Sequence, residues 1–165
     1  MDTKIIAIAG GSASGKSSIV DYIKNYFAKD LYVIGHDNYY KAHDDLSFED
    51  REKLNYDKPS SFDNDMFIKD LLDLKAGKDI DMPTYDYKIH TRSKKTIHVS
   101  PKKIILIEGI LVLYDKRIRD ILDTCVFIDA DSDVRLQRRI LRDTKERSRS
   151  LESVLTQYIK QVKPM

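Results

Sequence analysis

Short apolar runs alternate with longer amphipathic stretches along this chain. Four of the runs have the length and apolar content of buried strands, and they cover residues 5–9, 31–35, 104–109 and 124–129. Between them, apolar residues recur every three or four positions, which is the spacing of helices that pack one face against a sheet. This alternation predicts a three-layer α/β fold, with a parallel sheet covered by helices, in a single domain over residues 1–165.

The predicted helices differ in length and in composition. Helical spacing covers residues 15–27, 48–54, 65–76 and 114–122, and Gly77 is placed to end the third of these. A further helix carries the arginines between positions 135 and 142, and a last helix extends over 151–162. The last helix has an apolar stripe that we expect to lie in the core: Leu151, Val154, Leu155, Tyr158, Ile159 and Val162.

One segment interrupts the alternation of strands and helices. Ile80 and Met82 alternate with polar residues, as do Ile97 and Val99, and a polar bridge over residues 88–95 separates the two pairs. Alternation with a period of two on both sides of a polar connection predicts a small β-hairpin. Because the hairpin lies outside the α/β alternation, residues 80–99 are interpreted as an insertion that helps to shape a substrate site.

The composition limits which classes of binding partner and which compartment we expect for the chain. Charged residues make up 34% of the sequence and the net charge is +2, so no overall field favours nucleic acid or a membrane surface. The N-terminal apolar run is too short for a signal peptide, and no run has the length of a membrane span. Cys125 lies in an apolar run and is expected to be a packed thiol in a reducing compartment. The sequence therefore predicts a cytoplasmic protein and leaves self-association into a homo-oligomer open.

The most specific motif lies between the first strand and the first helix. Residues 10–17 match the phosphate-binding pattern G-x-x-x-x-G-K-[ST] in its strand–turn–helix context. The glycines let the backbone approach a phosphate, and the backbone N–H groups converge on the anion at the positive end of a helix. The lysine adds a charge, and the serine hydroxyl is a Mg²⁺ ligand. We therefore expect ATP or GTP to bind with Mg²⁺ at this loop: Gly10, Gly11, Ser12, Ala13, Ser14, Gly15, Lys16, Ser17 and Ser18.

Two acidic residues follow strands that should lie near this loop. Asp37 comes directly after the strand at 31–35, and ligands of open α/β sheets bind beyond the carboxyl ends of the strands. It is a candidate catalytic residue, although a carboxylate after a strand more often caps a helix or a turn. Glu108 closes the strand at 104–109, where a carboxylate beside a phosphate-binding loop holds Mg²⁺ together with Ser17. Taken alone this signal is weak, because many buried strands end in an acid.

The largest concentration of charge is a group of arginines near the C-terminus. In a phosphoryl-transfer enzyme, such a group is a candidate lid over residues 133–150 that binds phosphate oxygens. The alternative is a solvated helix face paired with Asp133, Asp143 and Glu146, which for any single arginine is the more common case. The arginines in question are Arg135, Arg138, Arg139, Arg142, Arg147 and Arg149.

Taken together, these motifs identify a resemblance to the uridine kinase (uridine–cytidine kinase) family of P-loop kinases over essentially the whole chain. It implies a P-loop NTPase fold and ATP-dependent phosphorylation of the 5′-hydroxyl of uridine or cytidine in pyrimidine salvage. The segments that carry it, weak singly but specific in this order, are 8–17 (IAGGSASGKS), 36–40 (HDNYY), 55–63 (NYDKPSSFD), 83–87 (PTYDY) with His90 and Arg92, 107–111 (IEGIL) and 129–139 (DADSDVRLQRR).

The resemblance also implies a role for individual residues. Asp37 looks like the general base that takes the proton of the nucleoside 5′-hydroxyl, while Lys16, Arg142 and Arg147 look like the cations on the phosphates. An imidazole in the base pocket suits uracil or cytosine, since its tautomers donate or accept a hydrogen bond. The implied substrate residues are Asp57 and Arg139 on the ribose hydroxyls, Tyr85, Tyr87 and His90 around the pyrimidine, and Arg149 and Gln157 near the nucleoside.

Two features depart from the family pattern. Ser148 stands between the last two arginines of the lid, where the family usually has glycine. The sequence ends at Met165, where family members continue, so the C-terminal part of the family fold is expected to be absent.

Three other interpretations remain open from the sequence. A related small-molecule kinase of the pantothenate or phosphoribulose type would keep Asp37 but lack the cluster of Tyr85, Tyr87 and His90. A GTPase-type switch is disfavoured, because the chain has no Asn-Lys-x-Asp base-reading motif. A regulator that binds RNA through the arginines is disfavoured by the acids between them and by the lack of aromatic residues nearby.

Overall fold

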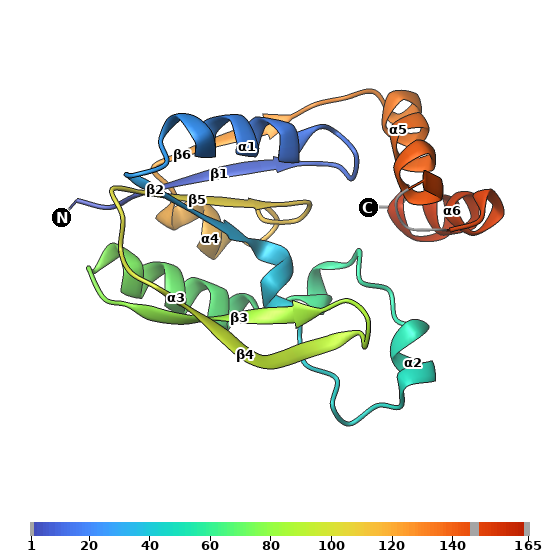
Figure 1. Cartoon of the computed structure of the whole chain (residues 1–165), viewed down its shortest axis with the longest axis horizontal. Coiled ribbons are helices and arrows are strands. Elements are labelled where there is room, and N and C mark those ends of the chain that lie inside the picture. Colours follow the sequence, from blue (N-terminus) through green and yellow to red (C-terminus); the bar gives the residue numbers. More distant parts are fainter. Residues whose placement is uncertain (1, 146–148, 164–165) are drawn as a thin grey trace.

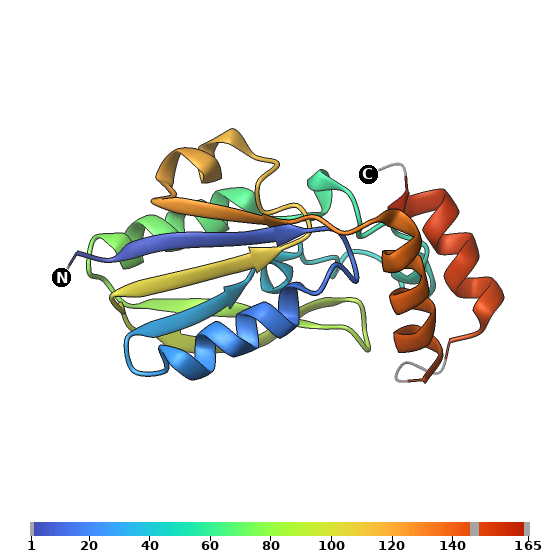
Figure 2. The same cartoon turned by 90° about the horizontal axis from the view of Figure 1, so that it is seen from above.

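The structure is a computed structural model, and it describes residues 2–145 and 149–163. At the centre of the described chain is a parallel sheet with the strand order β2-β5-β1-β6 (Figures 1 and 2). All four strands occupy segments that the sequence predicts as strands, and the expected α/β class is confirmed. Their bounds are β1 (Lys4–Gly10), β2 (Leu31–Gly35), β5 (Ile104–Gly109) and β6 (Thr124–Ile128).

Helices cover both faces of the sheet, as the three-layer prediction requires. Helix α1 (Lys16–Tyr26) lies on one face, and α3 (Asn64–Lys75) and α4 (Lys116–Ile121) lie on the other (Figure 1). Successive side chains of a strand point to opposite faces, so β1 contributes to two clusters. Ile5, Ala7 and Ala9 belong to the core on the α3 and α4 side, whereas Ile8 packs with Val20 of α1.

The predicted hairpin is present beneath α3. Strands β3 (Ile80–Asp86) and β4 (Thr91–Val99) pair antiparallel, and Ile80, Met82 and Val99 lie in the same core cluster as α3 (Figure 1). The expected polar bridge over 88–95 is too long, because β4 already begins at Thr91. Residues 94–98 of β4 all face solvent, so this part of the strand has the mostly polar, exposed character of a loop.

Three short elements lie between β2 and α3. The 3₁₀ turn η1 (His36–Tyr39) follows β2 directly. The short helix α2 (Phe48–Glu52) ends two residues earlier than the predicted range of 48–54. A second 3₁₀ turn, η2 (Pro59–Ser61), precedes α3, whose N-cap residue Asp63 accepts a hydrogen bond from the Met66 backbone N–H. Gly77, with φ +82°, follows α3 as predicted.

The C-terminal helices stand beyond the carboxyl end of the sheet. Helix α5 (Ser132–Lys145) packs against α6 (Leu151–Gln157), which continues into a π-helical turn, η3 (Tyr158–Val162) (Figures 1 and 2). Arg147 and Ser148, which the sequence analysis singled out, lie outside the described residues. None of the helices in the described ranges combines the length and the apolar character needed to cross a membrane.

Two expectations about burial are wrong. Cys125 is exposed, because its strand β6 is an edge strand and most of its side chains face solvent. The apolar stripe of the last helix is only partly core: Val154 and Tyr158 are buried, but Leu151 and Ile159 are 51% and 63% exposed. The reason is that this helix packs on α5 and not on the sheet, so only one narrow face is covered.

His36, at the end of β2, is a buried histidine that links the sheet to α3. Its ring stacks on Phe62 with ring centroids 4.0 Å apart, and its Nε2 lies 2.9 Å from the Asn64 side-chain oxygen. Gly109 passes so close that a Cβ there would lie 2.8 Å from the His36 Cβ. Burial lowers the pKa of His36 to about 4, only partly opposed by the Asn64 hydrogen bond and by the charge of Asp115. The residue before Asp37 is therefore a neutral, fixed anchor.

We expect this anchor to make the protein less stable in mild acid. The unfolded chain takes up a proton at His36 near its ordinary pKa of 6.5, but the folded chain does so only near 4. Lowering the pH through this window therefore favours unfolding, by up to about 3 kcal/mol at pH 4. Denaturant unfolding between pH 7 and 4 measures the effect. His36→Gln should lose less stability than the wild type over that range, whereas an equal loss in both proteins would contradict the assignment.

Candidate active site

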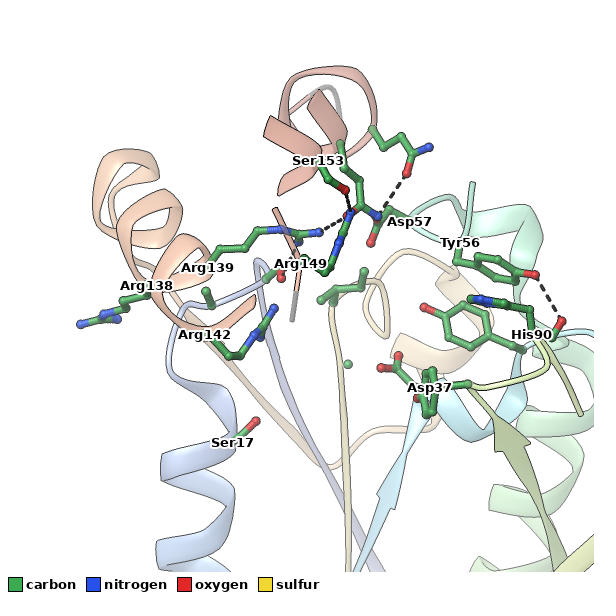
Figure 3. A pocket seen from close by; sticks show the side chains of 18 of the residues that line it. Ser17, Asp37, Tyr56, Asp57, His90, Arg138, Arg139, Arg142, Arg149 and Ser153 are labelled. Carbon is green, nitrogen blue, oxygen red and sulfur yellow. Dashed lines mark hydrogen bonds between the residues drawn. The ribbon is translucent and has the colours of Figure 1, made fainter. Parts of the chain in front are cut away.

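Most of the predicted site residues that the structure describes line one cleft at the carboxyl end of the sheet. Its volume is about 1960 Å³, and it runs from the loop between β1 and α1, past Asp37 and Glu108, to an aromatic group on the hairpin side. Parallel register places the strand ends together, since Gly35 pairs with Glu108 and Ala9 with Gly109. Figure 3 shows Ser17 and Asp37 on opposite sides of this cleft.

The loop between β1 and α1 has a backbone conformation that glycine adopts readily and other residues seldom adopt. Gly10 and Gly15 have φ of +156° and +103°, and a Cβ at Gly10 would lie 2.7 Å from the Ile128 carbonyl oxygen. Lys16 Nζ donates to the carbonyl oxygens of Gly10 and Gly11 at 2.8 and 3.2 Å. Among the predicted loop residues, positions 12–17 line the cleft, while Gly10, Gly11 and Ser18 do not.

The two carboxylates face the lysine across the end of the sheet. Burial lowers the pKa of Lys16, and the charges of Glu108 and Asp37 oppose that shift. Burial likewise raises the pKa of Glu108, opposed by Lys16. Asp37 comes from the 3₁₀ turn η1, which turns the chain into the cleft immediately after β2. This end of the cleft therefore brings the ammonium group of Lys16 together with the carboxylates of Asp37 and Glu108, partly shielded from water.

The donor atoms at this end of the cleft suit a hard divalent cation. Ser17 supplies a hydroxyl oxygen, Glu108 and Asp37 supply carboxylate oxygens, and all three line the same cleft. Mg²⁺ is bound by few protein oxygens together with water and phosphate oxygens. Within residues 2–145 and 149–163 there is no cluster of three or more His, Cys, Asp or Glu that could hold a metal by itself. A metal here would thus depend on phosphate oxygens for most of its ligands.

Aromatic side chains form the opposite wall. Tyr85 is buried with its ring centroid 5.1 Å from those of Tyr40 and Tyr87, and Tyr56 stacks on His90 at 5.8 Å. Sequence reasoning named Tyr85, Tyr87 and His90 but missed Tyr40 and Tyr56. Both lie inside the segments that carry the family resemblance, but nothing in their local pattern shows that they meet the hairpin.

His90 occupies the turn of the hairpin in an unusual backbone conformation. Its φ is +52°, in the left-handed region that non-glycine residues seldom adopt. Tyr56 donates its hydroxyl hydrogen bond to the carbonyl oxygens of Arg51 and His90, at 3.1 and 3.3 Å. Arg51 in turn donates to the Ile89 carbonyl oxygen at 2.9 Å. Arg51 and Tyr56, which precede Asp57 in the chain, therefore bind the turn that carries His90 (Figure 3).

The arginine group joins the two sides of the cleft. Arg139 donates to the Ser12 hydroxyl at 2.9 Å and to the Gln157 side-chain oxygen at 2.8 Å, and Arg149 also donates to Gln157. Burial raises the pKa of Asp57, and the positive charges of the nearby Arg139 and Arg149 oppose this shift. Arg138 donates to the Ser14 carbonyl oxygen at 3.3 Å. Of the predicted substrate residues, all seven therefore line one cleft: Asp57, Tyr85, Tyr87, His90, Arg139, Arg149 and Gln157.

A parallel sheet, a phosphate loop at its carboxyl end and an acid between that loop and the aromatic wall of the same cleft define a P-loop kinase. A model of the Phosphoribulokinase / Uridine kinase family matches residues 5–165. Two relatives named uridine kinase are similar over nearly the whole chain. The one from Staphylococcus carnosus (strain TM300) is 49% identical over 164 residues, 99% of this chain and 79% of its own length. The one from Streptococcus pneumoniae (strain Hungary19A-6) is 50% identical over 162 residues, 98% of this chain and 76% of its own.

Solved structures share the fold. A protein from Silicibacter sp. TM1040, described as a fructose transport system kinase, superposes with a TM-score of 0.80 at 19% identity. The match covers 98% of this chain and 81% of that one. The chain belongs to the Phosphoribulokinase / Uridine kinase family.

Proposed function

We propose that this chain transfers the γ-phosphoryl group of ATP to the 5′-hydroxyl of uridine or cytidine, giving the nucleoside monophosphate used in pyrimidine salvage. The uridine kinases that share about half of their aligned residues with it support this substrate class. The observation that carries the proposal is the position of Asp37. Its carboxylate faces the phosphate loop and the aromatic pocket within one cleft (Figure 3).

On the donor side, the chain binds and neutralises the triphosphate. The backbone N–H groups of the loop and the ammonium group of Lys16 bind the β- and γ-phosphates. Ser17 and Glu108 are the residues that would hold Mg²⁺, which when bound neutralises charge on the phosphates. Arg142 and Arg147 are proposed to bind the phosphate oxygens whose negative charge must be stabilised during transfer.

On the acceptor side, the chain orients one hydroxyl. Asp57 and Arg139 are proposed to bind the ribose hydroxyls, and the base lies among Tyr85, Tyr87 and His90. Asp37 accepts the proton of the 5′-hydroxyl as that oxygen bonds to the γ-phosphorus, and the bond from the γ-phosphorus to the bridging oxygen of ADP breaks. Gln157 of α6 supports Arg139 by accepting its hydrogen bond, and Arg149, just before α6, donates to the same Gln157 oxygen.

A second candidate is a kinase of the pantothenate or phosphoribulose type, which would use the same donor side. The aromatic wall favours the nucleoside, because a planar base gains stacking contacts that a phosphorylated sugar or an extended chain would not. A regulator without catalysis is disfavoured by Asp37, since a carboxylate in the same cleft as a bound triphosphate repels it, a cost for which nucleotide binding alone gives no reason.

A panel of acceptors tests the proposal. Purified protein with Mg-ATP is assayed against uridine, cytidine, adenosine, pantothenate and ribulose 5-phosphate, with ADP release as the readout. Turnover is expected with uridine or cytidine and not with the other three. Turnover with pantothenate or ribulose 5-phosphate alone would replace the proposed substrate, and ATP binding without any turnover would favour the regulator.

His90→Ala separates base recognition from nucleotide binding. If His90 contacts the base, the variant should lower kcat/KM for uridine by about 5- to 150-fold, the effect of losing a hydrogen bond in a buried site. The Kd for ATP, measured by calorimetric titration, should stay within about twofold because the phosphate loop is untouched. His98→Ala, on the exposed part of β4, is the matched control. Equal losses in uridine turnover and ATP affinity would mean that His90 only supports the hairpin.

A further inference from the structure

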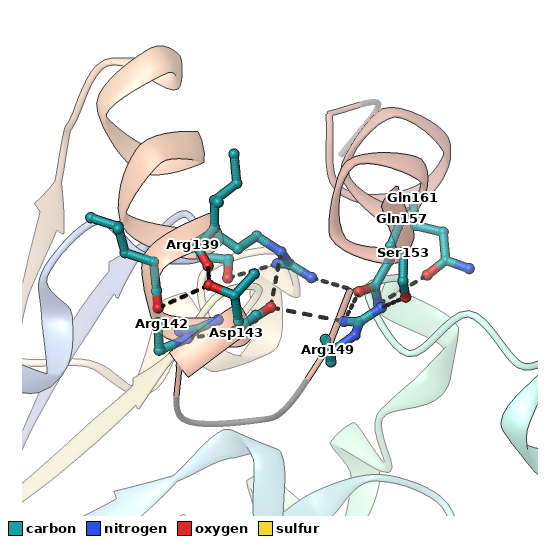
Figure 4. Close-up of polar contacts among 11 residues, drawn as sticks. Arg139, Arg142, Asp143, Arg149, Ser153, Gln157 and Gln161 are labelled. Carbon is teal, nitrogen blue, oxygen red and sulfur yellow. Dashed lines mark hydrogen bonds and ion pairs between the residues drawn. The ribbon is translucent and has the colours of Figure 1, made fainter. Parts of the chain in front are cut away.

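A carboxylate lies buried among the lid arginines. Asp143, in the last turn of α5, is 0% exposed, although it belongs to a helix whose other acid, Asp133, faces solvent. Figure 4 shows it at the centre of the polar contacts between α5 and α6. A fully buried carboxylate is costly unless positive charges and hydrogen bonds compensate it. Its surroundings therefore indicate what it does.

Three guanidinium groups surround Asp143. Its Oδ1 accepts a hydrogen bond from Arg142 Nε at 2.8 Å, while Oδ2 lies 3.6 Å from Arg139 Nε and 3.8 Å from Arg149 Nη1. Its backbone carbonyl oxygen also accepts the Arg149 N–H at 3.0 Å. Burial lowers the pKa of Arg139, and the neighbouring charges of Arg142 and Arg149 lower it further, whereas Asp57 and Asp143 raise it. Without Asp143 these cations would repel one another.

The contact with Arg142 differs from the other two in geometry. Arg139 and Arg149 already donate to Ser12, Ser153 or Gln157, so their terminal nitrogens are held by neutral groups. Arg142 is held through Nε, the nitrogen at the root of its guanidinium fork. The Arg142 side chain lines the cleft together with Asp37 and Ser17, and Figure 3 shows it on the same side of the cleft as Ser17, across from Asp37. A bidentate fork fixed at its base is well suited to a phosphate.

We propose that Asp143 is a positioning residue that fixes the Arg142 guanidinium for contact with the phosphates of the nucleotide. This proposal rests on the proposed function for the identity of the phosphoryl donor, but it does not depend on which acceptor is phosphorylated. Asp143 does not touch the substrate. It acts through Arg142, which in its absence would be displaced by the repulsion of Arg139 and Arg149.

The kinetic test uses a double-mutant cycle. Asp143→Asn keeps the shape of the side chain and removes its charge, and it is made in the wild type and in Arg142→Ala. With wild-type Arg142, kcat is expected to fall about 10- to 100-fold, the usual effect of a misplaced catalytic group. In the Arg142→Ala background, the same change should have little further effect. Equal fold-losses in both backgrounds would overturn the proposal, because Asp143 would then act independently of Arg142. Asp133→Asn, at the exposed start of α5, is the matched control and should retain wild-type kcat.

Two further measurements keep the proposal testable if Asp143→Asn unfolds or if the acceptor is not a nucleoside. Arg142→Lys leaves Asp143 intact and keeps the charge, but it removes the Nε–H donor. It should resemble Arg142→Ala in kcat, and wild-type kcat would show that the Asp143 contact is dispensable.

Calorimetric titration with Mg-ATP needs no acceptor at all. The rise in Kd caused by Arg142→Ala should be matched by Asp143→Asn and by the double variant, whereas an unchanged Kd in Asp143→Asn would count against positioning. Wild-type protein that binds Mg-ATP but phosphorylates no nucleoside would refute only the proposed function.

Discussion

Replacing Lys16 by alanine is expected to lower kcat/KM by about 10²- to 10³-fold, the effect typical of losing one group that stabilises developing charge. In the structure Lys16 Nζ donates to the carbonyl oxygens of Gly10 and Gly11 in the phosphate loop. Its partly buried ammonium group faces both Glu108 and Asp37. Removing it leaves those carboxylates to repel the triphosphate.

Steady-state kinetics with Mg-ATP and uridine measure this loss, and a melting curve establishes that the variant is folded. Lys24→Ala, in the exposed last turn of α1, is the matched control and should keep wild-type kinetics. Folded Lys16→Ala protein with wild-type turnover would sink the kinase assignment, because no other ammonium group of the loop could replace it.

Asp37→Asn is expected to lower kcat by about 10²- to 10⁴-fold, the usual contribution of general base catalysis. The amide keeps the shape of the carboxylate in η1, but it is neither basic nor charged. The KM for uridine should change little, since binding of the base and ribose is assigned to other residues. The loss should therefore appear in the chemical step and not in binding.

Single-turnover kinetics beside a melting curve separate this role from a structural one. A purely structural Asp37 would give a lower melting temperature with near-normal kcat per folded molecule. Asp21→Asn, on the exposed face of α1, controls for the loss of a charge. Retained kcat in well-folded Asp37→Asn protein would refute the assignment of the base.

The phosphate loop could be predicted because its function depends on local geometry. Residues 10–17 are consecutive, and the positive φ values at Gly10 and Gly15 are local backbone conformations that the glycines themselves indicate. The strands were predictable for a similar reason: a short run of apolar residues bounded by polar ones indicates a strand whether or not a neighbouring element covers it. The antiparallel hairpin of β3 and β4 followed from alternation on both sides of a connection.

Burial in the outer parts of the fold was not predictable from such patterns. Cys125 and Ile159 lie in apolar stretches that resemble core, yet both are exposed. An apolar pattern states which face of an element can be covered, but not whether another element lies there. The sheet order placed β6 at the edge, and the last helix packed on α5 instead of on the sheet.

The sequence by itself determined the α/β class, the phosphate loop, and the positions of Asp37 just after β2 and of Glu108 at the carboxyl end of β5, because these follow from short-range periodicity and backbone geometry. Only the tertiary structure decided which distant side chains meet. It brought Tyr40 and Tyr56 to the hairpin and buried Asp143 among Arg139, Arg142 and Arg149. Such contacts depend on how whole elements are packed, and no spacing along the chain encodes the distance between two atoms that different elements carry.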